Sequence, residues 1–531
     1  MTDDMIKLSD DFTAQMRHIL PDECDALLEA ITTTDPSVAI RVNDGRGISL
    51  SGDAVGRVPW CTTGRYLKER MPFTFDIDFQ TGRYYVQDAS SMFIHHVIKH
   101  VVKEPVRYLD LCAAPGGKTT TAISALPADS MVVANEIMPA RARVLYENIV
   151  KWGSPRCIVT NNAPHDFGKL HHFFDVVATD VPCSGEGMMR KDEEARNQWT
   201  PALVKQCAAL QKSIIADIWQ ALRPGGVLIY STCTYNREEN EEMVAHIVEQ
   251  YGAESVEIPV EADWHIHPAI DSPHHCYRFM PHRTNGEGLF MAVLRKPDDE
   301  RRAELRAKKS KGAKAKSIPV PRGVDAWLEN PKHYALSVAN DEVIAIPADI
   351  APLMPLFADL RVLQAGVTVG TVKGKNCVPS HALALSTALS NEAFAQSEVD
   401  YATAMAYMRG EAIVLPDAPR GYALLTYRDK PIGFANNLGN RANNLYPKPW
   451  RVLSTHIPTT PPEILSSQRV YRSTGLRVFG QTSQTDPTSP TGQIGAPSFQ
   501  ESMVPSYLLN FLNIYIALPF LHKLGMFCAK N

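Results

Sequence analysis

The chain has 531 residues, a length that predicts about three domains, each large enough to bury a core of its own. Hydrophobic residues make up 44% and charged residues 21%, which excludes a largely disordered chain. The formal net charge is −4, so a strongly basic, histone-like mode of nucleic-acid binding is excluded. Any surface for RNA or DNA must be a local basic patch.

The cysteines and the N-terminus indicate a reducing compartment. The ten cysteines include no pair separated by two residues, so neither a disulfide framework nor a zinc ribbon is predicted. The acidic start, Met1-Thr2-Asp3-Asp4, is unlike a secretory signal. We expect a cytoplasmic protein that is monomeric and whose thiols are reduced.

Residues 1–84 predict a small N-terminal α+β module. Apolar residues at helical spacing begin at Phe12 and Met16, and a strand-like run covers 37–43. Arg41 and Asn43 of that run either touch RNA or have a structural role, and the sequence leaves both interpretations open.

Residues 85–297 repeat a strand–helix pattern that is typical of an α/β fold with a parallel, doubly wound sheet. One helix is marked by apolar residues three and four apart from Leu203 to Leu222, and it ends before Pro224-Gly225-Gly226. Ligands of such a sheet bind at the carboxyl ends of its strands, where Asp110, Glu136, Asp180 and Cys233 are expected. The predicted strands cover 106–111, 131–135, 156–160, 174–179, 227–231, 255–260 and 289–294.

The remaining residues form three segments. Residues 298–322 are a basic linker, either a solvated spacer or a contact for RNA phosphates. Residues 323–460 predict a C-terminal α+β extension, of the kind that binds RNA, with strands at 343–346, 367–372, 412–415 and 422–427. Residues 461–531 combine a polar spacer with an apolar tail. Within that tail, 502–522 lacks charged residues, but its prolines and asparagines weaken the case for a membrane anchor.

A turn of small residues follows the first strand of the predicted sheet. Ala113, Ala114, Gly116 and Gly117 let backbone N–H groups approach a ligand as the next helix begins, and Lys118 adds a positive charge. The glycine that a P-loop needs six residues before Lys118 is absent, as is the G-x-G-x-x-G pattern of dinucleotide-binding folds. With an acid at the end of the second strand to accept ribose hydroxyls, the pattern favours S-adenosylmethionine as cofactor.

Two thiols follow the ends of two further strands. Cys183 stands in Asp180-Val181-Pro182-Cys183, and Cys233 stands in Ser231-Thr232-Cys233-Thr234. A thiolate that adds to C6 of cytosine makes C5 nucleophilic, and a base must later remove the C5 proton before the thiol leaves. Asp180 is suited to hydrogen-bond the ring of such an adduct. Two thiols beside a cofactor loop therefore predict methylation of a pyrimidine.

These segments resemble the signature motifs of the Sun/nucleolar-protein family of RNA cytosine-5 methyltransferases, most of all its bacterial small-subunit rRNA methyltransferase F type. The similarity covers about residues 8 to 297 and extends to the flanking segments Tyr84–Ser91 and Gly286–Phe290. The resemblance implies a class I, Rossmann-like methyltransferase fold and a 16S rRNA cytidine as substrate.

The resemblance also implies the roles of individual residues. Cys233 is the nucleophile and Cys183 assists release of the product, with Asp180 as a further catalytic residue. No metal is implied. The residues implied to contact S-adenosylmethionine are Cys112, Ala113, Ala114, Pro115, Gly116, Gly117, Lys118, Glu136 and Asp180.

Three alternatives remain open at this stage. One is a tRNA cytosine-5 methyltransferase with the same chemistry. Another is a DNA cytosine-5 methyltransferase, whose nucleophile would be Cys183. The third is a non-catalytic RNA-binding assembly factor, against which the presence of both thiols argues.

Two local features depart from simple expectations. After the third strand, where the family usually has an acid for the adenine, the chain reads Thr160-Asn161-Asn162-Ala163. A run of ligand-type residues from His265 to His282 includes Cys276, but its spacing fits no standard zinc site, so we predict a loop without metal.

Overall fold

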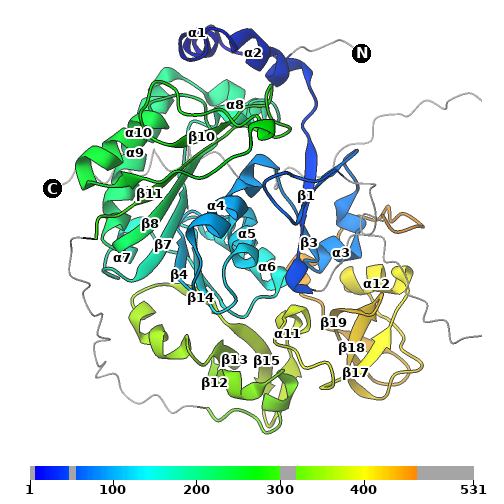
Figure 1. Cartoon of the computed structure of the whole chain (residues 1–531). Helices are drawn as coiled ribbons and strands as arrows, with labels where there is room; N and C mark the ends of the chain where they lie inside the picture. Colours follow the sequence, from blue (N-terminus) through cyan, green and yellow to red (C-terminus); the bar gives the residue numbers. More distant parts are fainter. Residues whose placement is uncertain (1–5, 47–55, 299–317, 463–531) are drawn as a thin grey trace, which may run out of the picture.

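A computed structural model describes residues 6–46, 56–298 and 318–462. Its centre is a sheet that runs from β10 to β14, with helices on both faces (Figure 1). Most of the predicted basic linker, and the predicted tail from residue 463 onward, lie outside the described residues.

The helices and strands of the described residues alternate through the central part of the chain. The helices are α1 (Asp10–Ile19), α2 (Cys24–Thr33), α3 (Ile77–Gln80), α4 (Phe93–Val101), α5 (Gly117–Ala125), α6 (Pro139–Trp152), α7 (Pro164–Phe167), α8 (Glu193–Gln198), α9 (Pro201–Trp219), α10 (Glu241–Tyr251), α11 (His381–Leu385) and α12 (Tyr401–Met408). The strands are β1 (Val38–Val42), β2 (Gly64–Leu67), β3 (Tyr84–Val86), β4 (Arg107–Asp110), β5 (Met131–Asn135), β6 (Cys157–Thr160), β7 (Phe174–Asp180), β8 (Leu222–Thr232), β9 (Glu254–Ser255), β10 (Cys276–Phe279), β11 (Leu289–Arg295), β12 (Tyr334–Ala339), β13 (Glu342–Pro347), β14 (Val362–Ala365), β15 (Val367–Lys373), β16 (Asn376–Pro379), β17 (Ala395–Glu398), β18 (Gly421–Tyr427), β19 (Lys430–Asn437) and β20 (Ala442–Asn444).

The middle of the central sheet is parallel, as the alternating pattern predicts. In the order β10-β11-β8-β7-β4-β5-β6-β14, strands β8 to β6 run parallel, and β11 and β14 are antiparallel to their neighbours. The chain moves outward from β4 through β5 to β6, then returns to the other side of β4 at β7. Such a reversal leaves a crevice beyond the carboxyl ends of β4 and β7, where ligands of doubly wound sheets bind.

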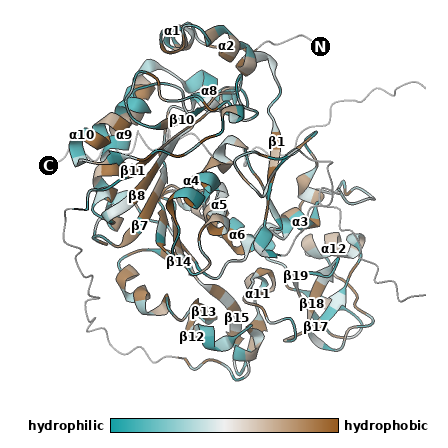
Figure 2. Cartoon of the chain, in the orientation of Figure 1, coloured by the Kyte–Doolittle hydropathy of each residue, from teal (hydrophilic) through white to brown (hydrophobic). Residues whose placement is uncertain are grey.

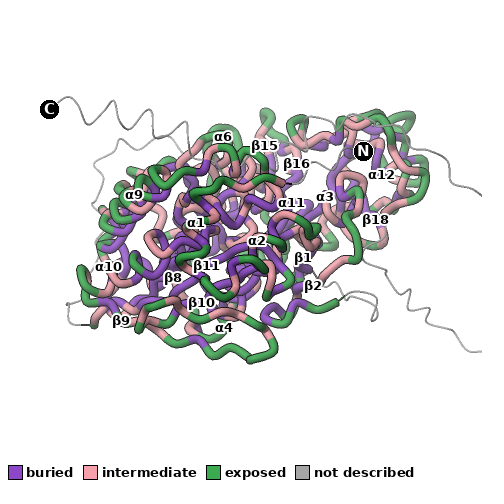
Figure 3. The backbone as a smooth tube through the Cα atoms, turned by 90° about the horizontal axis from the view of Figure 1, so that it is seen from above, coloured by how far each residue is buried: buried purple, intermediate pink, exposed green. Residues whose placement is uncertain are grey.

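The strands of this sheet are hydrophobic on both faces because helices cover both. Tyr108 packs into one core with residues of α4, α5 and α6, and the next residue, Leu109, packs into the other with residues of α9 and α10. Figure 2 shows the apolar character of β7 and β8, and Figure 3 shows buried central strands with exposed outer turns on α9. These findings confirm the α/β class I methyltransferase fold.

Smaller sheets flank the central one. β1, β2 and β3 form the N-terminal sheet, and α1 and α2 precede it, which confirms the predicted helix and strand there. In the extension, β12-β13-β15-β16 and β17-β18-β19-β20 form two sheets that share a core around α11. β14 of the same extension pairs with β6, so the extension continues the central sheet.

Several strand predictions were wrong. Of residues 255–260 only the end of β9 is a strand, because Pro259 and the polar residues around it leave the sheet edge after two paired residues. The histidine-containing run is not wholly a loop, since Cys276 begins β10 and is buried. Residues 412–415 form no strand, and Ile413 makes only an isolated bridge to Ala442.

Among the described helices, none is both long and apolar enough to cross a membrane. The uncharged run 502–522 lies outside the described residues.

Arg41 and Asn43 have structural roles. Asn43 donates hydrogen bonds to the backbone of Gly82 and Trp152 at 2.9 and 3.0 Å. Arg41 is fully buried, donates to Gln87 at 3.0 Å, and lies 4.4 Å from the Trp152 ring centroid. Neither side chain is available to RNA, because both are enclosed between the N-terminal sheet and the central domain.

We expect Arg41→Ala to lower the free energy of unfolding by about 3 kcal/mol, because it leaves buried polar partners unpaired. Urea unfolding followed by tryptophan fluorescence measures this. Arg17→Ala is the control, since the exposed Arg17–Asp25 pair at 3.6 Å should contribute about 0.5 kcal/mol or less. A loss of RNA affinity in Arg41→Ala without a loss of stability would contradict the structural role.

Candidate active site

The register of the parallel strands brings the two predicted thiols together. Asp180 at the end of β7 pairs in register with Ser231 near the end of β8. Cys183 and Cys233 follow these two residues by three and two positions, and their Sγ atoms lie 3.2 Å apart. Of the nine cysteines in the described part of the chain, Cys112, Cys183 and Cys233 are partly exposed and the others are buried.

The contact between the two sulfurs affects the protonation of Cys183. The hydrogen bond with the Cys233 sulfur is the largest cause that raises the pKa of the Cys183 thiol well above its usual range, and burial adds to it. Cys183 therefore keeps its proton at neutral pH and lies within hydrogen-bonding distance of the Cys233 sulfur.

Asp180 is held in one orientation between the cofactor loop and β8. Its Oδ2 accepts a hydrogen bond from Lys118 Nζ at 2.9 Å, and its Oδ1 accepts one from Ser231 Oγ at 2.8 Å. Each carboxylate oxygen retains a lone pair that is able to accept another donor. The Lys118–Asp180 ion pair thus joins the loop after β4 to the loop after β7.

The small-residue loop forms the turn from β4 into α5. Gly116 has φ +114°, which a residue with a side chain rarely adopts, and it begins the helix without a side-chain cap. Arg141 and Asn148 of α6 donate to the backbone oxygens of Ala114 and Pro115 at 2.9 and 2.8 Å. The start of α5 is therefore fixed, with its partial positive charge beside the carboxyl ends of the strands.

Glu136 follows β5 and is almost fully buried. Its Oε1 accepts a hydrogen bond from the Met138 N–H at 2.9 Å, and Arg141 lies 3.6 Å from its Oε2. Burial raises the pKa of Glu136, while Arg141 opposes the rise. The Glu136 carboxylate is able to accept hydrogen bonds from the ribose hydroxyls of S-adenosylmethionine. The backbone N–H groups of the loop are able to donate to the carboxylate of the same cofactor. These residues therefore fit S-adenosylmethionine.

The two asparagines after β6 are occupied by other partners. Asn161 donates to the backbone oxygen of Glu136 at 2.7 Å and accepts from the Arg361 guanidinium at 3.0 Å. Asn162 accepts from the Arg361 backbone N–H at 2.8 Å. Arg361 directly precedes β14, so the C-terminal extension supports the loop that would hold the adenine.

Gly185 lies two residues after Cys183 and has φ +74°. A Cβ placed on Gly185 would meet no atom within 4 Å, so the loop is open at this position.

The histidine-containing run offers no metal cluster. Within the described ranges no group of three or more His, Cys, Asp or Glu side chains is arranged to hold a metal ion. His282 instead contacts Glu23 of the N-terminal module at 2.8 Å.

Three further residues, which no motif of the sequence marks individually, hold the thiol loops in place. Glu186, Asn236 and Glu239 are each at most 1% exposed and lie between the loops that carry Cys183 and Cys233. A signal was present, because buried carboxylates need donors, and an acid-rich segment, Glu238 to Glu242, begins five residues after Cys233. Sequence alone did not distinguish it from the exposed start of a helix.

Asp110 provides a test of the site's electrostatics. Burial raises its pKa to about 7, and its Oδ2 accepts from Thr119 Oγ1 at 2.6 Å. The native state therefore binds a proton here more tightly than the unfolded chain does. This contribution to stability is fully present below about pH 4 and is lost as the pH rises through about 7.

We expect Asp110→Asn, which mimics the protonated acid, to flatten the dependence of unfolding free energy on pH between about 4 and 7. Urea unfolding at several pH values measures the difference from the parent protein, with the exposed Asp129→Asn as control. Parallel pH profiles for the parent protein and Asp110→Asn would contradict the raised pKa.

Comparisons with known proteins show which families the chain is similar to. Three family descriptions match in order: the N-terminal domain of 16S rRNA methyltransferase RsmF over residues 8–89, 16S rRNA methyltransferase RsmB/F over 100–295, and the methyltransferase RsmF PUA domain over 394–452. Among solved structures, a methyltransferase homolog protein from Pyrococcus horikoshii is 25% identical, with a TM-score of 0.46, and the match covers 55% of this chain and 96% of that one.

Full-length relatives extend the match. The ribosomal RNA small subunit methyltransferase F of Erwinia tasmaniensis is 30% identical over 471 residues, which cover 82% of this chain and 95% of that protein. The protein of the same name from Salmonella heidelberg is 31% identical over 425 residues, which cover 76% of this chain and 86% of the relative. On this similarity along most of its length, the chain belongs to the ribosomal RNA small subunit methyltransferase F family.

Proposed function

We propose that this protein is an S-adenosylmethionine-dependent RNA cytosine-5 methyltransferase that modifies a cytidine of 16S rRNA through a covalent bond between Cys233 and C6. The observation that carries the proposal is the thiol pair, 3.2 Å apart, at the strand ends beside the Lys118–Asp180 ion pair. The rRNA substrate follows from the names of the relatives.

The cofactor would be held by the loop from Cys112 to Lys118, by Glu136 and by Asp180. When bound, S-adenosylmethionine supplies an electrophilic methyl group. Backbone N–H groups at the start of α5 suit its carboxylate, and the Glu136 carboxylate suits its ribose hydroxyls. Lys118 donates a hydrogen bond to Asp180 Oδ2 at 2.9 Å and so fixes the orientation of that carboxylate.

Cys233 acts as the nucleophile. Its thiolate forms a bond to C6 of the cytosine, which moves an electron pair toward C5 and makes C5 nucleophilic. The Asp180 carboxylate accepts a hydrogen bond from the exocyclic amine and stabilises the adduct. The choice of Cys233 rather than Cys183 as the nucleophile follows from the resemblance of the segment from Ser231 to Glu239 to the family's motif.

Cys183 acts in release of the product. After C5 is methylated its proton must leave, so that the electron pair of that C–H bond re-forms the C5–C6 double bond and the Cys233–C6 bond breaks. The Cys183 thiol, 3.2 Å away, donates its proton to the departing Cys233 sulfur, and the Cys183 thiolate formed in this way accepts the proton from C5, which restores both thiols.

The flanking modules would supply the RNA surface, since the chain as a whole carries a net charge of −4. The PUA-type match over 394–452 lies in the extension. Arg361 of the same extension donates to Asn161 in the loop after β6, which would hold the adenine. Bisulfite sequencing of 16S rRNA and tRNA from a deletion strain distinguishes the two RNA substrates. Loss of a methylated cytidine from tRNA alone would contradict the rRNA assignment.

We expect Glu136→Gln to weaken S-adenosylmethionine binding about tenfold or more, because a charged acceptor is lost from the ribose site. Calorimetry in the presence of a chelator measures the affinity, and the exposed Glu104→Gln is the control. Binding of the parent protein should be undiminished by the chelator. A requirement for a divalent cation would contradict the assignment of the loop.

The two thiols should give opposite results in a gel assay. Cys233→Ala should abolish both methylation and any covalent RNA adduct, because C6 is no longer attacked. Cys183→Ala should accumulate an adduct that survives denaturing electrophoresis, because addition proceeds and elimination stalls. The buried Cys377→Ala of the extension is the control for loss of a thiol. An adduct formed by Cys233→Ala and absent from Cys183→Ala would reverse the roles.

A further inference from the structure

Two buried carboxylates connect the loops that carry the two thiols. Glu186 belongs to the loop after β7, Glu239 belongs to the loop after β8, and both are fully buried. Two buried carboxyl groups are unfavourable unless hydrogen-bond partners surround them, so their partners indicate what they do.

Glu239 reaches back to the loop of Cys183. Its Oε2 accepts from the Ser184 backbone N–H at 3.0 Å and from Gln211 Nε2 at 2.7 Å, and its Oε1 accepts from Asn236 Nδ2 at 2.8 Å. Every one of these partners is a donor. The position therefore requires a group that only accepts.

Glu186 makes the reciprocal contact with the loop of Cys233. Its Oε2 accepts from the backbone N–H groups of Tyr235 and Asn236 at 2.7 and 2.8 Å. Its Oε1 accepts from the Trp199 indole and from Gln15 at 3.0 and 2.9 Å. Each carboxylate thus fixes the backbone of the loop opposite its own.

Direct contacts between the loops complete the connection. The Gly187 N–H donates to the backbone oxygen of Cys233 at 2.9 Å, and the hydroxyls of Ser184 and Thr234 lie 2.8 Å apart. A Cβ on Gly187 would lie 2.7 Å from the Gly288 backbone oxygen, so these segments pack as closely as glycine permits.

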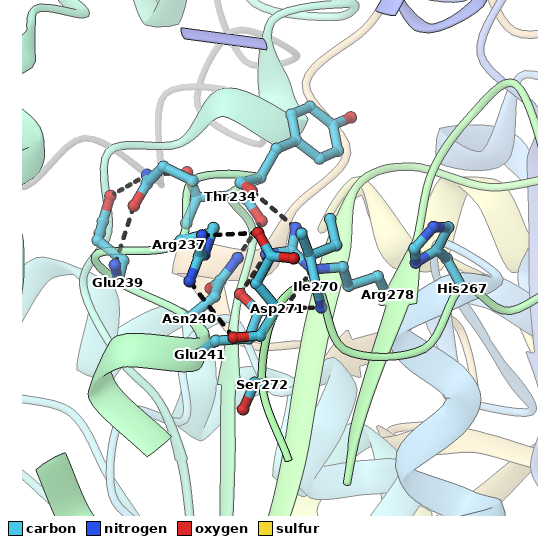
Figure 4. Close-up of polar contacts among 12 residues, drawn as sticks. Thr234, Arg237, Glu239, Asn240, Glu241, His267, Ile270, Asp271, Ser272 and Arg278 are labelled. Atoms are coloured by element: carbon cyan, nitrogen blue, oxygen red, sulfur yellow. Dashed lines mark hydrogen bonds and ion pairs between the residues drawn. The ribbon is translucent and has the colours of Figure 1, made fainter. Parts of the chain in front are cut away.

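A second group of contacts holds the loop of Cys233 from the other side. Arg278 of β10 donates to the Tyr235 backbone oxygen at 2.7 Å and forms a buried ion pair with Glu241 at the start of α10. Figure 4 shows this pair beside Asn240, whose side chain donates to the Thr234 backbone oxygen at 3.0 Å.

We propose that Glu186, Asn236 and Glu239 are positioning residues that set the separation of the Cys183 and Cys233 sulfurs and thereby couple addition at C6 to release of the product. The catalytic meaning of this inference rests on the proposed function, but the geometry can be tested without RNA. None of the three residues touches the reacting atoms, so they act through the two loops.

Glu239→Gln is the decisive variant. It keeps the volume of the side chain, but it turns an amide donor toward neighbours that are themselves donors. Thr234→Val is a milder second variant that removes the acceptor of one hydrogen bond from the Asn236 amide, at 3.0 Å, together with the hydroxyl contact with Ser184. Glu238→Gln is the matched control, because it removes a neighbouring charge and takes no part in the hydrogen bonds of Glu239.

The first measurement is oxidation of the thiol pair by diamide, which converts the two thiols to one disulfide and is itself reduced to the hydrazine. Mass spectrometry of linked peptides follows the rate, and Cys183→Ser supplies the background. We expect the parent protein and Glu238→Gln to form the Cys183–Cys233 disulfide at the same rate, and Glu239→Gln to form it severalfold more slowly.

The second measurement is methylation together with S-adenosylmethionine affinity. We expect Glu239→Gln to keep the cofactor affinity of the parent protein and to lose about 100-fold in kcat, a loss typical of reacting groups displaced by about 1 Å. If Glu239→Gln fails to bind the cofactor, Thr234→Val replaces it in both measurements, with a smaller loss expected in each.

Equal oxidation rates in the parent protein and a variant that binds the cofactor would overturn the positioning role, as would the absence of a disulfide in the parent protein. A parent protein that oxidises as expected but methylates no RNA would overturn the proposed function and leave the positioning role intact.

Discussion

The register between two parallel strands is the constraint on which the site depends. Asp180 and Ser231 are neighbours across β7 and β8, and the Asp180 carboxylate accepts a hydrogen bond from the Ser231 hydroxyl at 2.8 Å. A shift of one residue would turn every side chain of β7 to the opposite face, which the two helix layers do not permit. Burial of both faces of the sheet therefore fixes where the two following loops begin, and with them the two thiols.

Beyond the strand ends, hydrogen bonds rather than hydrophobic packing hold the loops in place. The loop after β4 is tied to Asp180 by Lys118, and the two thiol loops are tied to each other through Glu186 and Glu239. Because these carboxylates are buried, each lost donor leaves a costly unpaired acceptor, which resists small displacements of the loops. The same arrangement leaves Cys183 and Cys233 partly exposed.

The sequence predicted the features that depend on local pattern. Strand–helix alternation located β4 to β8, and residue types at strand ends located Asp110, Glu136, Asp180 and both thiols. It could not predict β14, because a strand that joins the sheet from about 200 residues away leaves no local signal. The partners of Asn161 could not be predicted for the same reason, since Arg361 reaches that loop only in the folded chain. The sequence left the role of Arg41 open, because its contact with the Trp152 ring forms only in the folded chain.

The most direct measurement of the central claim is to map the covalent bond itself. RNA that carries 5-fluorocytidine at the target position traps the adduct, because the fluorine at C5 cannot leave as the proton does. Digestion of the trapped complex and mass spectrometry should locate the nucleotide on the peptide that contains Cys233. A nucleotide on the peptide that contains Cys183 would contradict the account.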